Sequence, residues 1–127
     1  KYLHKNIQNS SDINITDCIF RNTNNKGGYT SADCDNVKII RCKVFNPKNG
    51  GFNLSGHTNS LVKDCLVQSD KLIDTGYAGI RFPNSAKNNI AEGNTVINCG
   101  RGIFVLTGSQ NNVIKNCTIN GTMYQGV

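Results

Sequence analysis

Among the side chains between residues 57 and 81 that could take part in acid–base chemistry, we take four as the candidate catalytic group: His57, Asp70, Asp74 and Arg81. The two aspartates could act as general acid and base or hold a cation, with Arg81 beside them. His57, in Gly56-His57-Thr58, could reach the same edge of the molecule as these three side chains. An ordinary surface loop accounts for the aspartates as well.

A second candidate set consists of residues that could bind a sugar chain: Thr30, Asn53, Tyr77, Arg81 and Phe104. Polar groups can meet hydroxyls, an aromatic ring can stack on a pyranose, and a guanidinium can bind a carboxylate. Such residues are useful only if the fold lines them up. An ordinary solvated face is the competing interpretation.

The sequence supplies that alignment through a repeated glycine-led segment. Its copies are Gly28-Tyr29-Thr30-Ser31, Gly51-Phe52-Asn53-Leu54, Gly79-Ile80-Arg81-Phe82 and Gly102-Ile103-Phe104-Val105, with Gly126-Val127 opening a fifth. The glycines step by 23, 28, 23 and 24 residues. Strand alternation then predicts that Thr30, Asn53, Arg81 and Phe104 face outward, and we call these four residues the ladder. It predicts that the following residues face inward: Phe52, Leu54, Ile80, Phe82, Ile103 and Val105.

A second series repeats in phase with the first. It places Cys or Asn at positions 18, 42, 65, 94 and 117, each three residues after an aliphatic or small residue, with steps of 24, 23, 29 and 23. Two series with one period indicate a solenoid. Each coil then carries short strands separated by Asn, Gly and Ser turns, and equivalent strands pair in parallel sheets.

The composition agrees with an all-β chain. The 127 residues include 20 Asn and 21 Ile or Val but one Glu, so β-branched and turn-forming residues dominate. No apolar run approaches the length of a membrane span. We therefore exclude a helix bundle and a membrane protein.

These repeats resemble the right-handed parallel β-helix proteins of the pectin-lyase-like class, which include polysaccharide-active enzymes and phage tail spikes. The phrases that carry the resemblance are Asn112-Val113-Ile114-Lys115-Asn116-Cys117-Thr118-Ile119 and Gly102-Ile103. It implies an all-β, right-handed, single-stranded parallel β-helix of about five coils of 23–24 residues. We expect residues 1–127 to form one such domain, a fragment of a longer protein, with the rest of that chain or a homo-oligomer capping the coil ends.

The cysteine position has a physical interpretation within such a coil. A small side chain turns inward after the aliphatic residue and stacks on its counterpart in the next coil. Because parallel Cβ vectors do not converge as a disulfide requires, we predict reduced, buried thiols at Cys18, Cys42, Cys65 and Cys117. In the family this bend often carries an internal Asn ladder, which Asn94 would retain. We expect no metal site, because no CxxC or Cys/His clip exists, and no cofactor.

The third coil is about six residues longer than its neighbours, and the excess falls within residues 69–77. An insertion into a regular solenoid protrudes as a loop, here at the edge of the outward face that carries the sugar-binding candidates. Gly56-His57 followed by Gly79-Ile80-Arg81 weakly resembles the Gly-His and later Arg-containing strand of polygalacturonases. That family's paired aspartates and Asn-x-Asp element have no matching positions here.

The sequence therefore favours a module that binds or processes polysaccharide, from an extracellular bacterial protein or a phage tail. The net charge of +6 suits an acidic polysaccharide. The lysines are scattered and no nucleic-acid motif accompanies them, so we expect no nucleic-acid partner. Catalysis stays open; a lyase, a hydrolase or an epimerase would be the candidates. A structural shaft or oligomerisation segment is the alternative. We expect the protein to be extracellular, on a cell surface or on a virion.

Overall fold

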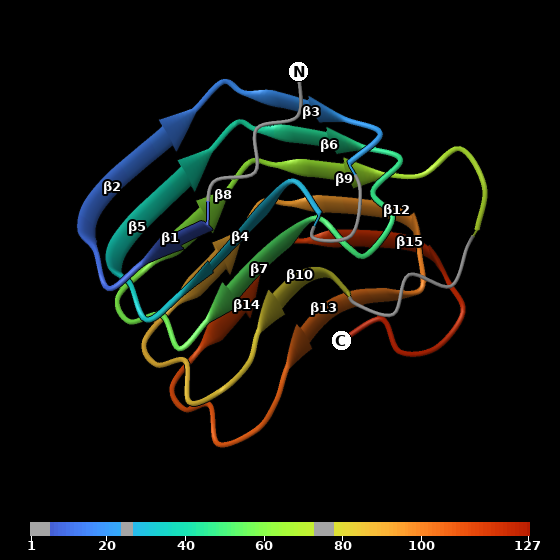
Figure 1. The fold of residues 1–127 in the computed structure, drawn as a ribbon. Helices are drawn as coiled ribbons and strands as arrows, with labels where there is room; N and C mark the ends of the chain where they lie inside the picture. Colours follow the sequence, from blue (N-terminus) through green and yellow to red (C-terminus); the bar gives the residue numbers. More distant parts are fainter. Residues whose placement is uncertain (1–5, 24–26, 73–77) are drawn as a thin grey trace.

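The protein is a solenoid of about five coils in which every strand pairs in parallel with its equivalents one coil away (Figure 1). The computed structural model describes residues 6–23, 27–72 and 78–127. These residues form fifteen strands in three sheets and contain no helix. The predicted all-β parallel β-helix is confirmed.

Each sheet takes one strand from each coil, as the strand order shows. Sheet A contains β1 (Asn6–Gln8), β4 (Tyr29–Ala32), β7 (Phe52–Ser55), β10 (Ala78–Phe82) and β13 (Arg101–Val105). Sheet B contains β2 (Ser11–Thr16), β5 (Asp35–Ile40), β8 (Leu61–Lys63), β11 (Ile90–Glu92) and β14 (Val113–Lys115). Sheet C contains β3 (Ile19–Arg21), β6 (Lys43–Phe45), β9 (Leu66–Gln68), β12 (Thr95–Cys99) and β15 (Thr118–Thr122).

The core consists of columns of like residues, because the register places equivalent positions of successive coils side by side. In sheet B one column runs Ile15, Ile39, Val62, Ala91 and Ile114. Its three middle members are 0% exposed. The inward assignments in sheet A are confirmed for Phe52, Leu54, Ile80, Phe82 and Ile103, each at most 1% exposed. Val105, on the outermost strand of the sheet, is 37% exposed.

Sharp corners between the sheets explain the abundance of asparagine, aspartate and glycine. At the corner between sheets B and C, successive coils place Asp17, Arg41, Asp64, Gly93 and Asn116 in the left-handed region, with φ between 51° and 65°. Glycine reaches this region freely, and Asn and Asp tolerate it better than other side chains do. Arg41 departs from the rule, and its side chain binds Asp17 on the coil before.

The glycine that leads each sheet A segment is required by space. A Cβ on Gly51 would overlap the side chain of Val67 and the carbonyl of Gly79, and one on Gly79 would overlap Val96. The column Gly28, Gly51, Gly79 and Gly102 therefore lets the chain turn from sheet C into sheet A against the core valines and Ile119. This turn fixes where the following outward residues stand.

Candidate functional site

The outer face of sheet A carries the predicted ladder of side chains. Thr30 pairs with Asn53, Asn53 with Arg81, and Arg81 with Phe104, on β4, β7, β10 and β13. All four are half-buried. Adjacent strands lie about 4.8 Å apart, so the ladder spans about 14 Å across the face. Two polar groups, a guanidinium and an aromatic ring are thus brought into one line.

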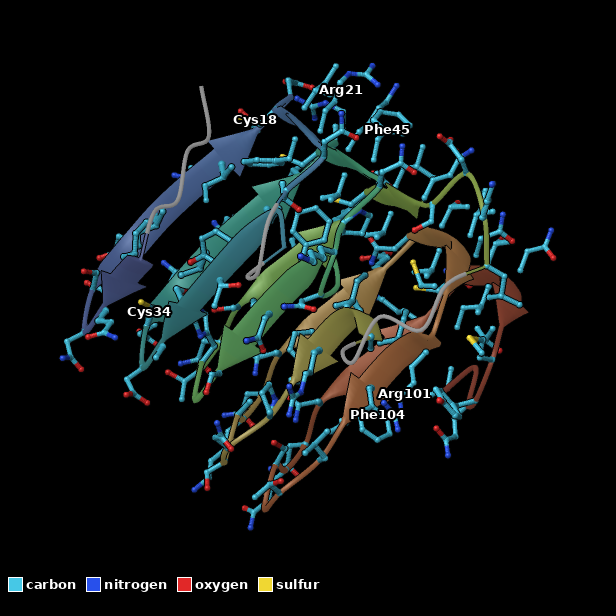
Figure 2. The ribbon with its side chains drawn as sticks, turned by 45° about the vertical axis from the view of Figure 1, so that its right-hand side comes forward. Cys18, Arg21, Cys34, Phe45, Arg101 and Phe104 are labelled. Carbon is cyan, nitrogen blue, oxygen red and sulfur yellow. The ribbon has the colours of Figure 1, made fainter. Side chains whose placement is uncertain are left out.

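A second guanidinium joins this line at its C-terminal end. The Arg101 Cζ lies 5.1 Å from the centroid of the Phe104 ring and 4.8 Å from that of Tyr124. The Arg101 Nε donates to Gln125 Oε1 at 3.1 Å. Figure 2 shows Arg101 directly beside Phe104. Stacking and the bond to Gln125 orient Arg101, so its charge is held next to the ladder.

The sequence prediction included Arg81 and Phe104 of this cluster but missed Arg101 and Tyr124. Arg101 stands directly before the repeated glycine Gly102, and Tyr124 lies two residues before Gly126. Both positions therefore flank the glycine column in successive coils. An arginine one residue before Gly102 and an aromatic residue two residues before Gly126, the equivalent glycine of the next coil, are the signal that the sequence offered.

The arrangement is suited to binding an extended anionic chain. Guanidinium groups bind carboxylates through charge-assisted hydrogen bonds, and aromatic faces stack on sugar rings. The spacing of the ladder repeats regularly, as the units of a linear polymer do. Side chains of these types can bind and orient such a chain.

The structure describes one aspartate of the candidate catalytic group, Asp70, and its side-chain hydrogen bond is to Asn46, which follows a strand of sheet C. Asp70 follows β9 at the end of sheet C, whereas Arg81 lies in sheet A. The Asp70 carboxylate accepts from Asn46 Nδ2 at 2.9 Å, and the Asp70 N–H donates to Asn46 Oδ1 at 2.9 Å. Asp70 therefore links the end of the third coil, where the extra residues begin, to the second coil. Asp74 and Tyr77 lie outside the described residues, so their assignments stay predictions.

His57 is not at the edge of the sheet A face, where the sequence prediction placed it. Its side chain is 0% exposed and points into the core. The residue after it, Thr58, bridges Asp35 on one side and Lys87 on the other, so His57 shares a column with Cys34 and Ala86. Cys34 and Ala86 are inward-facing core residues, which explains why His57 is one too.

A buried hydrogen-bond network holds His57 in place. Its Nδ1 lies 3.1 Å from the carbonyl oxygen of Ser55 and its Nε2 lies 2.7 Å from Ser31 Oγ, which is 2.7 Å from the Tyr29 hydroxyl. The carbonyl can only accept, so Nδ1 carries the proton and Nε2 accepts from Ser31. Burial lowers the pKa of His57 and raises the pKa of Tyr29 to about 12. Burial therefore favours the neutral forms of both rings, while the hydrogen bonds to Ser55 and Ser31 shift the two pKa values in the opposite direction.

Sheet C carries an arginine–aromatic pair on the opposite end of the molecule. The Arg21 Cζ lies 4.5 Å from the centroid of the Phe45 ring, and the two residues pair between β3 and β6. Figure 2 places this pair far from Arg101 and Phe104. Its row continues through Gln68, Ile97 and Asn120, and it has one arginine and one ring where the sheet A cluster has two of each. It is a natural comparison for any test of the ladder.

Two features are absent from the parts of the chain that the structure describes. No group of three or more His, Cys, Asp or Glu side chains among them could hold a metal ion. No helix among these residues is long and apolar enough to cross a membrane.

The fold and the repeated columns define the class of protein. Residues 6–127 match the family model described as the right-handed beta helix region. The chain therefore belongs to this family of right-handed parallel β-helices. A search of curated proteins found no match. Because many activities occur on one solenoid, family membership defines the fold and leaves the activity to the side chains of the site.

Proposed function

We propose that this protein is a carbohydrate-binding β-helix module that holds an acidic polysaccharide along the outer face of sheet A. The observation that carries the proposal is the register of Thr30, Asn53, Arg81 and Phe104 on four successive strands. A line about 14 Å long would contact roughly three sugar units, one for each step between strands.

The charge of the face favours an acidic polymer over a neutral one. Arg81 and Arg101 both lie beside Phe104, the first by strand register and the second by ring contact. The whole chain carries a net charge of +6, which would attract a polyanion before contact. A role of this kind suits a protein outside the cell, on a cell surface or on a virion.

Titration calorimetry with oligogalacturonate tests the proposal. Arg81→Ala and Arg101→Ala should each weaken binding about tenfold or more, since a charge-assisted hydrogen bond contributes about 1.5–3 kcal/mol. Arg21→Ala is the matched control, because it removes the same side chain and a similar ring contact from sheet C. It should change the affinity less than about twofold, by the loss of long-range attraction alone.

Equal losses in all three variants would show attraction by net charge without a site. No binding by the parent protein of any acidic or neutral oligosaccharide would remove the carbohydrate proposal. The alternative of a structural shaft would then be preferred, because three uninterrupted parallel sheets suit a rigid spacer.

Processing of the bound chain is a separate proposal that rests on the aspartates. If Asp70 or Asp74 acts as acid or base, Asp70→Asn or Asp74→Asn should abolish turnover of oligogalacturonate while leaving its affinity unchanged. Absent turnover by the parent would limit the protein to binding, and unchanged turnover in both variants would show that neither aspartate is the acid or base.

A further inference from the structure

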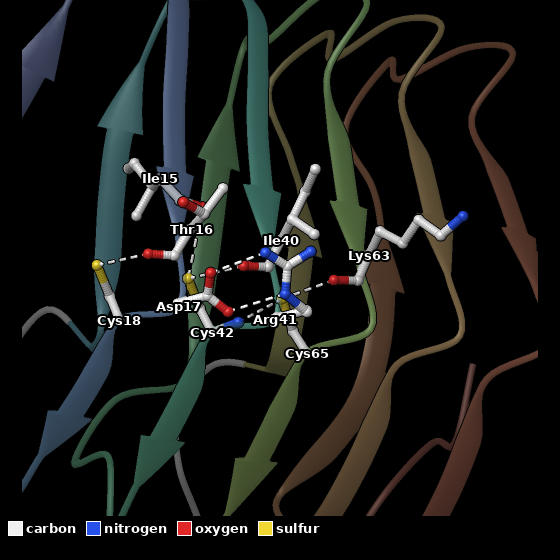
Figure 3. A network of polar contacts seen from close by, with 9 residues as sticks. All are labelled: Ile15, Thr16, Asp17, Cys18, Ile40, Arg41, Cys42, Lys63 and Cys65. Carbon is white, nitrogen blue, oxygen red and sulfur yellow. Dashed lines mark hydrogen bonds and ion pairs between the residues drawn. The ribbon is translucent and has the colours of Figure 1, made fainter.

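The inward bend between sheets B and C stacks three thiols on successive coils. The Cys18 carbonyl accepts from Lys43 N at 2.9 Å and the Cys42 carbonyl accepts from Leu66 N at 3.0 Å, so Cys18, Cys42 and Cys65 are equivalent positions. Figure 3 shows their side chains in one row, all turned the same way. Parallel coils separate such atoms by about 4.8 Å. All three thiols are free.

The sulfur atoms lie in a pocket of backbone carbonyls. Cys18 Sγ donates to Thr16 O at 3.3 Å, and Cys42 Sγ lies 3.5 Å from both Ile15 O and Ile40 O. Cys65 Sγ also accepts the backbone N–H of Cys42 at 3.4 Å. These backbone contacts fix the positions of the sulfur atoms. The S–H protons are the atoms that a metal ion would replace.

An ion pair on the surface stabilises the N-terminal end of this column of thiols. Arg41 and Asp17 directly precede Cys42 and Cys18, and the Arg41 Nε and Nη2 donate to the two Asp17 carboxylate oxygens at 2.8 and 2.7 Å. This paired contact fixes the first two coils against sliding (Figure 3). Cys18 is half-buried whereas Cys42 is 0% exposed, so the pair has one accessible member.

Two sulfurs at this spacing match one kind of metal geometry. Bonds of about 2.3 Å, as in zinc thiolates, span about 4.6 Å when two of them lie in line. A tetrahedral zinc ion would need further ligands, and the described part of the chain groups no three suitable side chains around an ion. A soft cation that accepts two collinear thiolates needs none.

We propose that Cys18 and Cys42 form a two-coordinate site for a soft, thiophilic divalent d10 cation, for which Hg(II) is the probe. Binding breaks the two S–H bonds, forms two S–Hg bonds and releases two protons to solvent, with no change of oxidation state. The product is neutral, and a neutral product avoids the cost of a buried charge.

The neighbouring column position provides an internal control. Cys117 occupies the same bend, but the adjacent coil has Asn94 there, whose Nδ2 lies 3.8 Å from Cys117 Sγ. Cys117 therefore has no thiol on that neighbouring coil with which to share a metal ion. Cys117→Ser should leave the proposed site intact, whereas Cys42→Ser and Cys18→Ser should each destroy it.

The experiment titrates the fully reduced protein with Hg(II) at pH 7, in competition with glutathione. The first equivalent should give two sulfur neighbours by X-ray absorption, release two protons and raise the melting temperature by joining two coils. Cys18→Ser should weaken this equivalent at least about a hundredfold, because loss of an outer-shell partner alone costs 10–100-fold. Cys18→Ser changes a half-buried side chain, so it tests the site even if Cys42→Ser fails to fold.

One sulfur neighbour per mercury in the parent protein would overturn the proposal. An unchanged first equivalent in Cys18→Ser would overturn it as well, and so would loss of that equivalent in Cys117→Ser. Each result would mean that mercury reacts with separate thiols.

Discussion

Asn94 Oδ1 accepts the backbone N–H of Cys65 at 2.9 Å, at the bend where the other coils carry a sulfur. The Asn94 Nδ2 also donates to the Val62 carbonyl at 2.9 Å. One side chain amide therefore satisfies a backbone donor and a backbone acceptor of the previous coil. In the preceding pair of coils Cys65 Sγ accepts the N–H of Cys42 in the same way, at 3.4 Å. Asparagine and cysteine are interchangeable here because both can accept this bond.

Replacing Asn94 should show how much this bend contributes to stability. Asn94→Ala leaves the buried Cys65 N–H without its acceptor and removes the side-chain donor to the Val62 carbonyl. Because an unsatisfied buried donor costs about 1–3 kcal/mol, we expect a loss of about this size in urea unfolding. Asn94→Cys restores an acceptor and should lose clearly less. Equal losses in the two variants would show that the bend depends on amide volume alone.

The six thiols should differ in their rates of labelling. Cys34, Cys42, Cys65 and Cys99 are each at most 3% exposed, whereas Cys18 and Cys117 are half-buried. A thiol reagent should therefore modify two cysteines quickly in the folded protein and all six after unfolding without reductant. Fewer than six reactive thiols in the unfolded, unreduced chain would reveal disulfides.

Cys42→Leu should cost roughly 1–3 kcal/mol, because it overpacks a small position.

His57 should make folding stability depend on pH. Its folded pKa is lowered by burial, whereas the unfolded chain binds a proton near pH 6.5. As pH falls through about 6.5, the unfolded state gains a proton that the folded state does not, so stability decreases. The decrease ends only below the lowered folded pKa.

Urea unfolding of the parent and of His57→Gln at pH 7.5 and pH 5 measures this effect. The carboxylates contribute equally to both proteins, so the difference between their pH slopes isolates His57. The parent should lose more stability than the variant between these pH values. Parallel slopes would mean that the ring titrates normally in the folded state.

Substitutions in the glycine column should show that the space around each glycine limits the side chain at that position. Gly51→Ala places a methyl group against Val67 and the Gly79 carbonyl, whereas Gly126→Ala meets nothing within 4 Å. Overpacking of this kind costs about 1–3 kcal/mol or more. We expect a clear fall in melting temperature for Gly51→Ala and almost none for Gly126→Ala. Equal tolerance would place the turn elsewhere than the structure has it.

The sequence was sufficient to predict the coils because the register repeats the same environment at each step. The spacing of Cys18, Cys42, Cys65, Asn94 and Cys117 equals one coil at every step but the long one, and each stacked position selects for similar side chains. The outward ladder followed from the same register by strand alternation. Periodic positions can be predicted in this way because each is specified several times.

The residues that the prediction missed or misplaced occupy positions that the repeats do not specify alike. His57 shares a column with Cys34 and Ala86, which have neither its size nor its polarity, so its inward direction was hidden. Arg101 and Tyr124 meet across two coils through side chain contacts that no single segment encodes. The long third coil has no counterpart with which to compare Asp70.

The arginine Nε–Hε signals of the protein offer the most direct test of the central claim, that sheet A binds an acidic polysaccharide. In a nitrogen–proton NMR titration with oligogalacturonate, we predict that the Arg81 and Arg101 signals shift and saturate together while the Arg21 signal stays in place. A shift of Arg21 equal to those of Arg81 and Arg101, or no shift of Arg81 and Arg101 at any concentration of the oligosaccharide, would contradict the account.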